Sequence, residues 1–330
     1  MPTCLSSGND HCRTADPQYL DIGLVNNMPD TALAGTERQF LSLLEAASGS
    51  LVVRLTFYAM PEVPRSDAGR RYVSSYCVID DLWDRPLDGL IVTGTEPHAA
   101  DLTEEPYWAS LTRLLQWAEC NTFSTVWSCL ASHAAVLHID GIQRRRLDVK
   151  RFGVFDCERV HDHPLTTGAP RRWRMPHSRW NDLPEDALRS SGYCVLTHSE
   201  AAGVDTFVKQ RNSLFVFFQG HPEYGAATLL REYRRDIQRF LRRESDTYPP
   251  MPQGYFDHET LAALSALRER ALAHREQEVM EGFPDALAAG SVANTWGPDA
   301  VRIYRNWLSY MAERKSCERK PKPFAASVHK

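Results

Sequence analysis

Short apolar runs alternate with amphipathic stretches through the first 141 residues of the chain. Runs typical of buried strands lie at 19–27, 51–59, 85–97 and 122–128. Apolar residues spaced three and four apart predict helices at 35–47, 106–120 and 130–141. This alternation is typical of a parallel sheet covered by helices on both faces, so the pattern predicts an α/β fold.

The pattern of the second half is weaker until residue 205. Strands are predicted at 205–209 and 213–219, and helices at 226–242, 259–281 and 297–313. We therefore expect four parts along the chain. They are a flexible N-terminus at 1–18, a main α/β domain at 19–243, a proline-rich connector with C-terminal helices packed on that domain at 244–313, and a mobile basic tail at 314–330.

Composition narrows the possible functions. The chain has 330 residues, 43% of them hydrophobic, and a formal net charge of −4, which gives no electrostatic reason to expect nucleic acid. No apolar run reaches the length that spans a bilayer, and the polar start lacks the apolar stretch of a secretory signal. The 8 cysteines lack the paired spacing of a disulfide framework or zinc site. We expect a cytoplasmic protein with reduced thiols and no bound metal.

Cys129 lies in the stretch VWSCLA, where a predicted strand turns into a predicted helix. A helix N-terminus favours a thiolate through its unpaired N–H groups, and the same groups, that of Leu130 among them, can hold an oxyanion. This position therefore predicts a nucleophile. The alternative is a cysteine that is buried only for packing.

A nucleophilic thiol needs a base, and two histidines are candidates. His221 follows the strand predicted at 213–219, and Pro222 fixes a turn that could fold Glu223 back onto the imidazole. A carboxylate that orients the ring would complete a triad. The alternative is a loop histidine with a structural partner. His133 is less suitable as the base because its side chain would point along its helix. A metal site formed by Cys129 and His133 is also disfavoured, because the sequence offers no second pair of ligands nearby.

Several motifs in order resemble the homoserine O-succinyltransferase family, whose members are relatives of the class I glutamine amidotransferases. The matching stretches are NNMPDTALAGTERQFLSLL, LDGLIVTG, EEPYW, FGVFDC, MPHSRWND, GHPEYGAATLLREYRRD and NTWGPDAVRIYRNWLSYM. The resemblance implies a three-layer, flavodoxin-like sheet with a C-terminal helical elaboration, residues 19–243 being the catalytic domain. It also implies that Cys129 is acylated, that His221 is the base and that Glu223 is its partner.

The same resemblance implies a site for the acceptor amino acid. In the family's helix after GHPEY, a glutamate and an arginine hold the substrate, and they match Glu232 and Arg235. Because these residues lie three apart, they share one helical face. Ser178 and Arg179, in the stretch MPHSRW, are assigned to substrate binding as well. From the residues alone, an ion pair on a solvated face is the alternative for Glu232 and Arg235.

The chain departs from the family in two places. Asp30 and Thr31 follow Met28-Pro29, where the family has lysines, one of which is thought to assist catalysis. The loop position associated with the acyl donor, glycine for succinyl and glutamate for acetyl, aligns with His98. A histidine could attract a succinyl carboxylate, or its bulk could fill the space that succinyl needs. The choice of donor therefore stays open.

We expect acyl transfer from acyl-CoA, succinyl-CoA or acetyl-CoA, to the hydroxyl of L-homoserine in methionine biosynthesis. Succinyl transfer is favoured, and we expect a ping-pong route without a bound cofactor. The family resemblance implies a homodimer. Acetyl transfer, or serine or another hydroxy amino acid as acceptor, would satisfy the same residues. A glutamine-hydrolysing enzyme with a synthetase partner and a non-catalytic binding protein are alternatives from other classes.

Overall fold

A seven-stranded sheet forms the centre of the protein in the computed structural model, which describes residues 19–319. Five neighbouring strands are parallel. The sixth runs antiparallel to them, and the seventh pairs antiparallel with the sixth and so has the direction of the first five. The order across the sheet is β2 (Val52–Tyr58), β1 (Tyr19–Val25), β3 (Gly89–Thr93), β4 (Ser124–Ser128), β11 (Leu214–Phe218), β10 (Thr206–Gln210) and β7 (Cys194–Val195). The mostly parallel sheet confirms the predicted α/β class.

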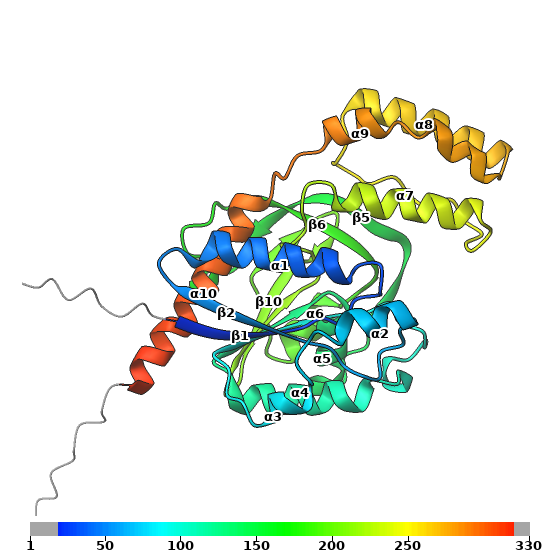
Figure 1. Cartoon of the computed structure of the whole chain (residues 1–330). Helices are drawn as coiled ribbons and strands as arrows, with labels where there is room; N and C mark the ends of the chain where they lie inside the picture. The colour runs from blue at the N-terminus through cyan, green and yellow to red at the C-terminus, as the bar shows by residue number, and fades with distance from the viewer. Residues whose placement is uncertain (1–18, 320–330) are drawn as a thin grey trace, which may run out of the picture.

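Helices cover both faces of this sheet, which gives three layers (Figure 1). Alternate side chains of a strand enter different cores: Val126 packs with α1 (Leu33–Ser48) and α10 (Gly297–Arg319), whereas Trp127 packs with α4 (Trp108–Asn121) and α5 (Leu130–Asp140). This alternation follows from the two-residue repeat of a strand. β3 and β11 have nearly continuous apolar sequences because the side chains on both faces of each strand are buried.

A second, four-stranded sheet, which the sequence did not predict, lies beside the first. Its order is β6 (Arg172–Asp182), β5 (Arg145–Arg159), β8 (Thr197–Ser199) and β9 (Gly203–Val204). The long antiparallel pair of β5 and β6 places Phe152 opposite Ser178 and Gly153 opposite His177. The MPHSRW stretch is therefore part of a strand.

The C-terminal region differs from the prediction in its boundaries. The helix expected over 259–281 is divided into α8 (His258–Ala273) and a 3-10 turn, η3 (Gln277–Gly282). The helix expected to end at 313 continues as α10 to Arg319, and Lys315 binds Asp88 at 2.6 Å. The proposed tail would therefore start later than residue 314. The flexible segment expected at 1–18 lies outside the described residues.

The remaining helices are short, apart from α7, which follows the GHPEY stretch. In Figure 1, α7, α8 and α9 form a layer that stands away from the central sheet. The bounds are α2 (Asp67–Val73), α3 (Asp80–Trp83), α6 (Glu185–Ser190), α7 (Thr228–Leu241), α9 (Asp285–Ser291), η1 (Leu102–Glu104) and η2 (Pro164–Thr166).

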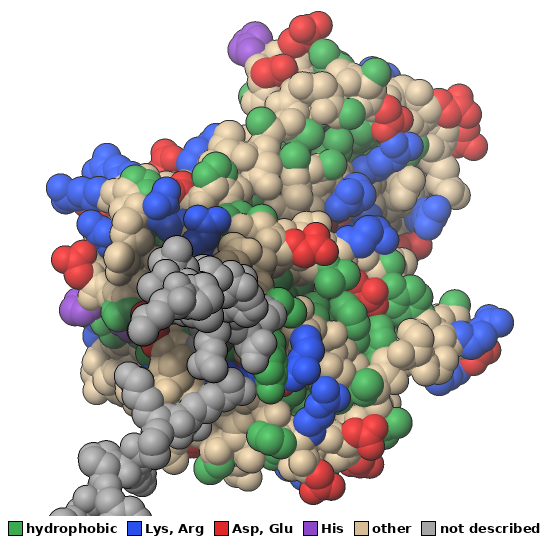
Figure 2. All heavy atoms as spheres, turned by 60° about the vertical axis from the view of Figure 1, so that its left-hand side comes forward, with side chains coloured by type: hydrophobic (Ala, Val, Ile, Leu, Met, Phe, Trp, Pro, Cys, Tyr) green, Lys and Arg blue, Asp and Glu red, His purple; other side chains and the backbone are tan. Residues whose placement is uncertain are grey.

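The surface carries charges of both signs. Figure 2 shows acidic and basic side chains distributed over one face, with hydrophobic side chains between them. This mixture fits the small formal net charge of −4. No helix within residues 19–319 is both long enough and apolar enough to cross a membrane.

Candidate active site

Cys129 occupies a strained turn between β4 and α5. Its backbone has φ 52° and ψ −113°, and only Arg243 shares a positive φ among the non-glycine residues in 19–319. Such a conformation costs free energy and persists only where the surroundings enforce it. The backbone N–H of Cys129 donates to the carbonyl of Phe218 at 2.8 Å, which ties the turn to β11. Cys129 as a whole is half-buried.

The loop after β3 closely approaches the start of α5. A Cβ added to Gly94 would lie 2.5 Å from the Cβ of Leu130 and 3.0 Å from its backbone nitrogen. It would also lie 3.1 Å from the backbone nitrogen of Ala131. The first N–H groups of a helix have no partner within the helix. Glycine at position 94 therefore keeps open the space that these donors face, where an oxyanion could bind.

His221 lies three residues after β11, in contact with both expected partners. Its Nδ1 lies 2.8 Å from Oε1 of Glu223, and both side chains are buried. Burial lowers the pKa of His221, but the charges of Glu223 and Cys129, with hydrogen bonds to both, raise it well above its ordinary value. The imidazole is thus placed between the carboxylate and the thiol. The backbone N–H of His221 donates to Pro176 at 2.8 Å.

Glu232 connects β6 to the loop that carries His221. Its carboxylate accepts hydrogen bonds from Ser178 Oγ at 2.5 Å and from the hydroxyl of Tyr224 at 2.6 Å. The ring of Tyr224 stacks on His221. The structure therefore brings Glu232 and Ser178 together, and the ring of Tyr224 lies between Glu232 and His221. Tyr224 was not identified from the sequence, although it lies within the GHPEY stretch.

Arg235 lies one turn further along α7 and is partly exposed. Its Nε and Nη2 donate to Oδ1 of Asp236 at 2.9 and 2.7 Å. The other oxygen of Asp236 accepts from Lys150 at 3.0 Å. Asp236 therefore holds the guanidinium group by one oxygen and leaves part of it open to solvent.

Arg179 is held almost entirely by the protein. Its Nη1 donates to the carbonyl of Asn181 at 2.8 Å and to Asp182 at 2.9 Å, and its Nη2 donates to the carbonyl of Ala202. Burial lowers its pKa, while the charges of Asp182 and Cys129 act in the opposite direction. Arg179 is thus a buried cation within electrostatic reach of Cys129.

His98 lies exposed on the loop that follows β3. Its backbone N–H and that of Ala99 donate to the same oxygen of buried Glu105, at 2.6 and 2.7 Å. In the same loop, Glu96 forms an ion pair with Arg239 of α7 at 3.3 Å. The loop is therefore held at Glu96 by Arg239 and at His98 and Ala99 by Glu105, which fixes the backbone conformation around His98.

Asp30 has a structural role at the start of α2. It accepts hydrogen bonds from the backbone N–H and the hydroxyl of Ser66 at 2.8 and 2.7 Å, and it pairs with Arg65 at 3.3 Å. A Cβ on Gly69 would collide with the Asp30 carboxylate at 2.0 Å. Burial raises the pKa of Asp30, but the bonds to Ser66 and Arg65 lower it below its ordinary value. This residue therefore anchors the start of α2.

His133 is a buried residue with its own partner. Its Nε2 lies 2.9 Å from Oε1 of Gln219, and burial lowers its pKa to about 3. The ring is therefore neutral at physiological pH. This environment agrees with the choice of His221 over His133 as the base.

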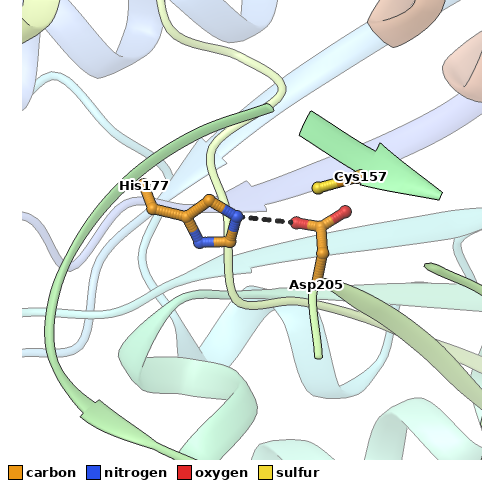
Figure 3. Close-up of side chains that lie close together, drawn as sticks. All are labelled: Cys157, His177 and Asp205. Carbon is orange, nitrogen blue, oxygen red and sulfur yellow. Dashed lines mark ion pairs between the residues drawn. The ribbon is translucent and has the colours of Figure 1, made fainter. Parts of the chain in front are cut away.

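Behind the loop of His221 lies a buried cluster that the sequence did not suggest: Cys157, His177 and Asp205 (Figure 3). Nε2 of His177 lies 3.3 Å from Oδ1 of Asp205, and the ligand atoms of all three lie within 4.8 Å of one another. Burial raises the pKa of Cys157 well above its ordinary value, which opposes the thiolate form that a metal requires. A Cβ on Gly220 would lie 2.6 Å from Oδ1 of Asp205. The cluster therefore packs tightly against the residue before His221.

A strained cysteine after a parallel strand, beside a buried His–Glu pair, defines a protein of the class I glutamine amidotransferase-like fold. A solved glutamine amidotransferase from Thermotoga maritima has this fold, with a TM-score of 0.50 at 13% identity over 89% of this chain and 98% of that one. The chain belongs to the homoserine O-succinyltransferase family, whose model matches residues 5–317.

Relatives of the same name extend over nearly the whole chain. The homoserine O-succinyltransferase of Rhodopseudomonas palustris is 50% identical over 312 residues, which cover 93% of this chain and 94% of the relative. That of Bradyrhizobium japonicum is 45% identical over 314 residues, covering 94% of this chain and 96% of the relative. The chain is therefore an acyltransferase of this family.

Proposed function

We propose that this protein moves a succinyl group from succinyl-CoA to the hydroxyl of L-homoserine through a thioester on Cys129. Membership of the family supports the reaction. The observation that carries the mechanism is the placement of His221, which interacts with the strained Cys129 on one side and with Glu223 at 2.8 Å on the other. A nucleophile, a base and an orienting carboxylate in this order are the parts that covalent acyl transfer needs.

In the first half-reaction, the Cys129 thiolate attacks the thioester carbon of the donor. The carbonyl oxygen becomes an oxyanion, for which the backbone N–H of Leu130 is the proposed donor. When the carbon–sulfur bond to CoA breaks, the CoA thiolate takes a proton from the His221 imidazolium. The products are free CoA, an acylated Cys129 and a neutral imidazole. Buried Arg179 adds positive charge near the reacting sulfur.

In the second half-reaction, neutral His221 removes the proton from the homoserine hydroxyl, and the oxygen attacks the acyl carbon. The Cys129 thiolate then leaves, and His221 is again protonated. Glu232 is the proposed partner of the substrate ammonium group, with Ser178 and Tyr224 fixing its carboxylate. Arg235 is the proposed partner of the α-carboxylate, because a guanidinium group binds carboxylates in a planar fork.

The decisive experiment is a steady-state assay of succinyl-CoA and acetyl-CoA against homoserine and serine. We expect the highest kcat/KM with succinyl-CoA and homoserine, and no turnover in Cys129→Ala. A preference for acetyl-CoA or for serine would change the assigned donor or acceptor, but the proposed mechanism would stand. Ammonia release from glutamine would instead favour the hydrolase.

The homodimer that the family resemblance implies is tested by the mass of the protein in solution.

Iodoacetamide labelling separates an active site from a non-catalytic fold. If the site is active, we expect iodoacetamide to label Cys129 much faster than the exposed Cys77 and Cys120, because His221 beside it can accept the thiol proton. Equal labelling of the three thiols would favour a binding protein that has kept the fold.

A further inference from the structure

A cavity of about 480 Å³ lies beside α5, on the side of the helix that carries His133. Its wall is formed by the loop around His98, by α5, by Arg144 and Arg146, which flank the first residue of β5, and by Asn181 of β6. The backbone N–H of His133 donates to the carbonyl of Cys129 at 3.4 Å, so His133 follows Cys129 by one turn of the chain. The cavity thus begins about one helical turn from the proposed nucleophile.

Arg144 and Arg146 bring two positive charges to this cavity. Neither forms an ion pair within the described part of the chain. Nη1 of Arg144 is enclosed yet lacks a hydrogen-bond partner, and its Nη2 has only a long contact of 3.4 Å to the carbonyl of Ala100. The guanidinium group of Arg146 lies over the ring of Trp180, 4.5 Å from its centre. Both cations are available to a ligand.

A half-buried cation without a partner is costly, and a bound anion would remove that cost. Burial lowers the pKa of Arg144, and the nearby Tyr107 and Glu105 only partly offset this. One oxygen of Glu105 is used by the backbone of His98 and Ala99, and its other oxygen is enclosed without a hydrogen bond. The cavity is therefore lined on one side by an arginine that lies near the charges of Glu105 and Asp101 but forms an ion pair with neither.

We propose that this cavity binds the anionic end of the acyl donor, with Arg144 as the counter-ion. The inference rests on the acyl transfer proposed above and identifies a residue that selects the donor. Two anions are present in such a donor: the free carboxylate of a dicarboxylic acyl group and the phosphates of CoA. The carboxylate is favoured because a four-carbon acyl group on Cys129 spans about one helical turn, whereas the pantetheine arm separates the phosphates from the thioester by much more.

The position of His98 supports the same assignment. The structure places His98 in the wall of the cavity together with Arg144. A succinyl carboxylate paired with Arg144 would then lie against the loop that carries His98.

The test measures acylation of Cys129 by succinyl-CoA and by acetyl-CoA in Arg144→Ala. Loss of a hydrogen bond between charged groups weakens binding roughly 10- to 100-fold. We expect kcat/KM for succinyl-CoA to fall by that factor and kcat/KM for acetyl-CoA to stay within twofold. Arg145→Ala is the matched control, because Arg145 is the next residue along the chain and is exposed but does not line the cavity. Arg144→Lys should restore part of the rate.

An equal fall with both donors would assign Arg144 to a CoA phosphate, and unchanged rates with both would overturn the proposal. Binding of succinyl-CoA and of CoA to Cys129→Ala, with and without Arg144→Ala, gives a readout that needs no turnover. If wild-type protein forms no acyl-cysteine with either donor, the proposed function fails. In that case, the binding measurements alone would test whether the cavity binds the donor. Equal affinities with and without the Arg144→Ala change would refute the role proposed for Arg144. Thermal unfolding checks that each variant is folded.

Discussion

The ring of Tyr224 lies flat against the imidazole of His221, with ring centroids 4.1 Å apart and planes inclined by 17°. The hydroxyl of Tyr224 donates to Glu232 at 2.6 Å, and its backbone carbonyl accepts from the indole N–H of Trp296 at 2.9 Å. One side chain therefore connects the proposed base to the proposed acceptor carboxylate. Its position depends on a tryptophan from the segment before α10.

Tyr224→Phe is predicted to separate these two roles. Phenylalanine keeps the stacked ring but removes the donor to Glu232, and a hydrogen bond to a charged group contributes about 1.5–3 kcal/mol. We expect KM for homoserine to rise roughly 10- to 100-fold while acylation of Cys129 keeps its wild-type rate. Single-turnover acylation and steady-state transfer measure the two effects. Tyr224→Leu, which loses the stack as well, should also slow acylation; equal behaviour of both variants would refute this assignment.

Glu223→Gln is predicted to change the pH dependence of acylation. The Glu223 charge raises the pKa of His221, so His221 stays protonated, as acylation requires, to a higher pH. Acylation should fall as pH rises through this pKa. Without the carboxylate, burial lowers the pKa, and the fall should move to lower pH along with a reduced rate. Rapid-mixing measurements across pH test this; an alkaline limb at the same pH in both proteins would contradict the role of Glu223.

Arg235→Ala is predicted to impair the second half-reaction alone. Loss of a paired charge in a binding site costs about 2–5 kcal/mol, or roughly 30- to several-thousand-fold in kcat/KM. Arg235→Lys should recover only part, because a point charge does not reproduce the fork. Arg234→Ala is the matched control, since Arg234 pairs with Asp285 on α9 instead. Transfer to homoserine at the wild-type rate in Arg235→Ala would show that this arginine is only a surface charge.

Gly220→Ala is predicted to displace His221. The added methyl would lie 2.6 Å from both Asp205 Oδ1 and Met175 Cγ, so the backbone must move. Overpacking of this kind costs about 1–3 kcal/mol in stability. We expect a lower melting temperature and a slower acylation step. Gly225→Ala, whose methyl would meet only Thr228 at 3.9 Å, should leave both nearly unchanged. Wild-type acylation in Gly220→Ala would show that the buried cluster does not position the base.

Central strands such as β3 and β11 could be predicted because every residue in them is buried, which produces nearly uninterrupted apolar runs. β5 was missed because charged residues interrupt its pattern: RRLDVKR precedes the buried FGVF, and its exposed side faces solvent. Its pairing with β6 is also long-range and leaves no local signal. The Thr197–Ser199 and Gly203–Val204 strands are too short to show a period.

Residues of the candidate site could be found where chemistry and position coincide. Cys129 and His221 both follow predicted strands, and the carboxyl ends of parallel strands meet at one edge of the sheet. Gly94 and Gly220 could not be found, because their roles depend on close approach to residues distant in sequence. The cavity at Arg144 was missed for the same reason, since its walls come from four separate segments.

The central claim is the thioester on Cys129, and intact-protein mass spectrometry tests it most directly. Wild-type protein mixed with succinyl-CoA and no homoserine should gain the mass of one succinyl group. Peptide mapping should place it on Cys129, and added homoserine should remove it as the ester forms. Cys129→Ala should show no such adduct. An enzyme that turns over while Cys129 stays unmodified would contradict the account.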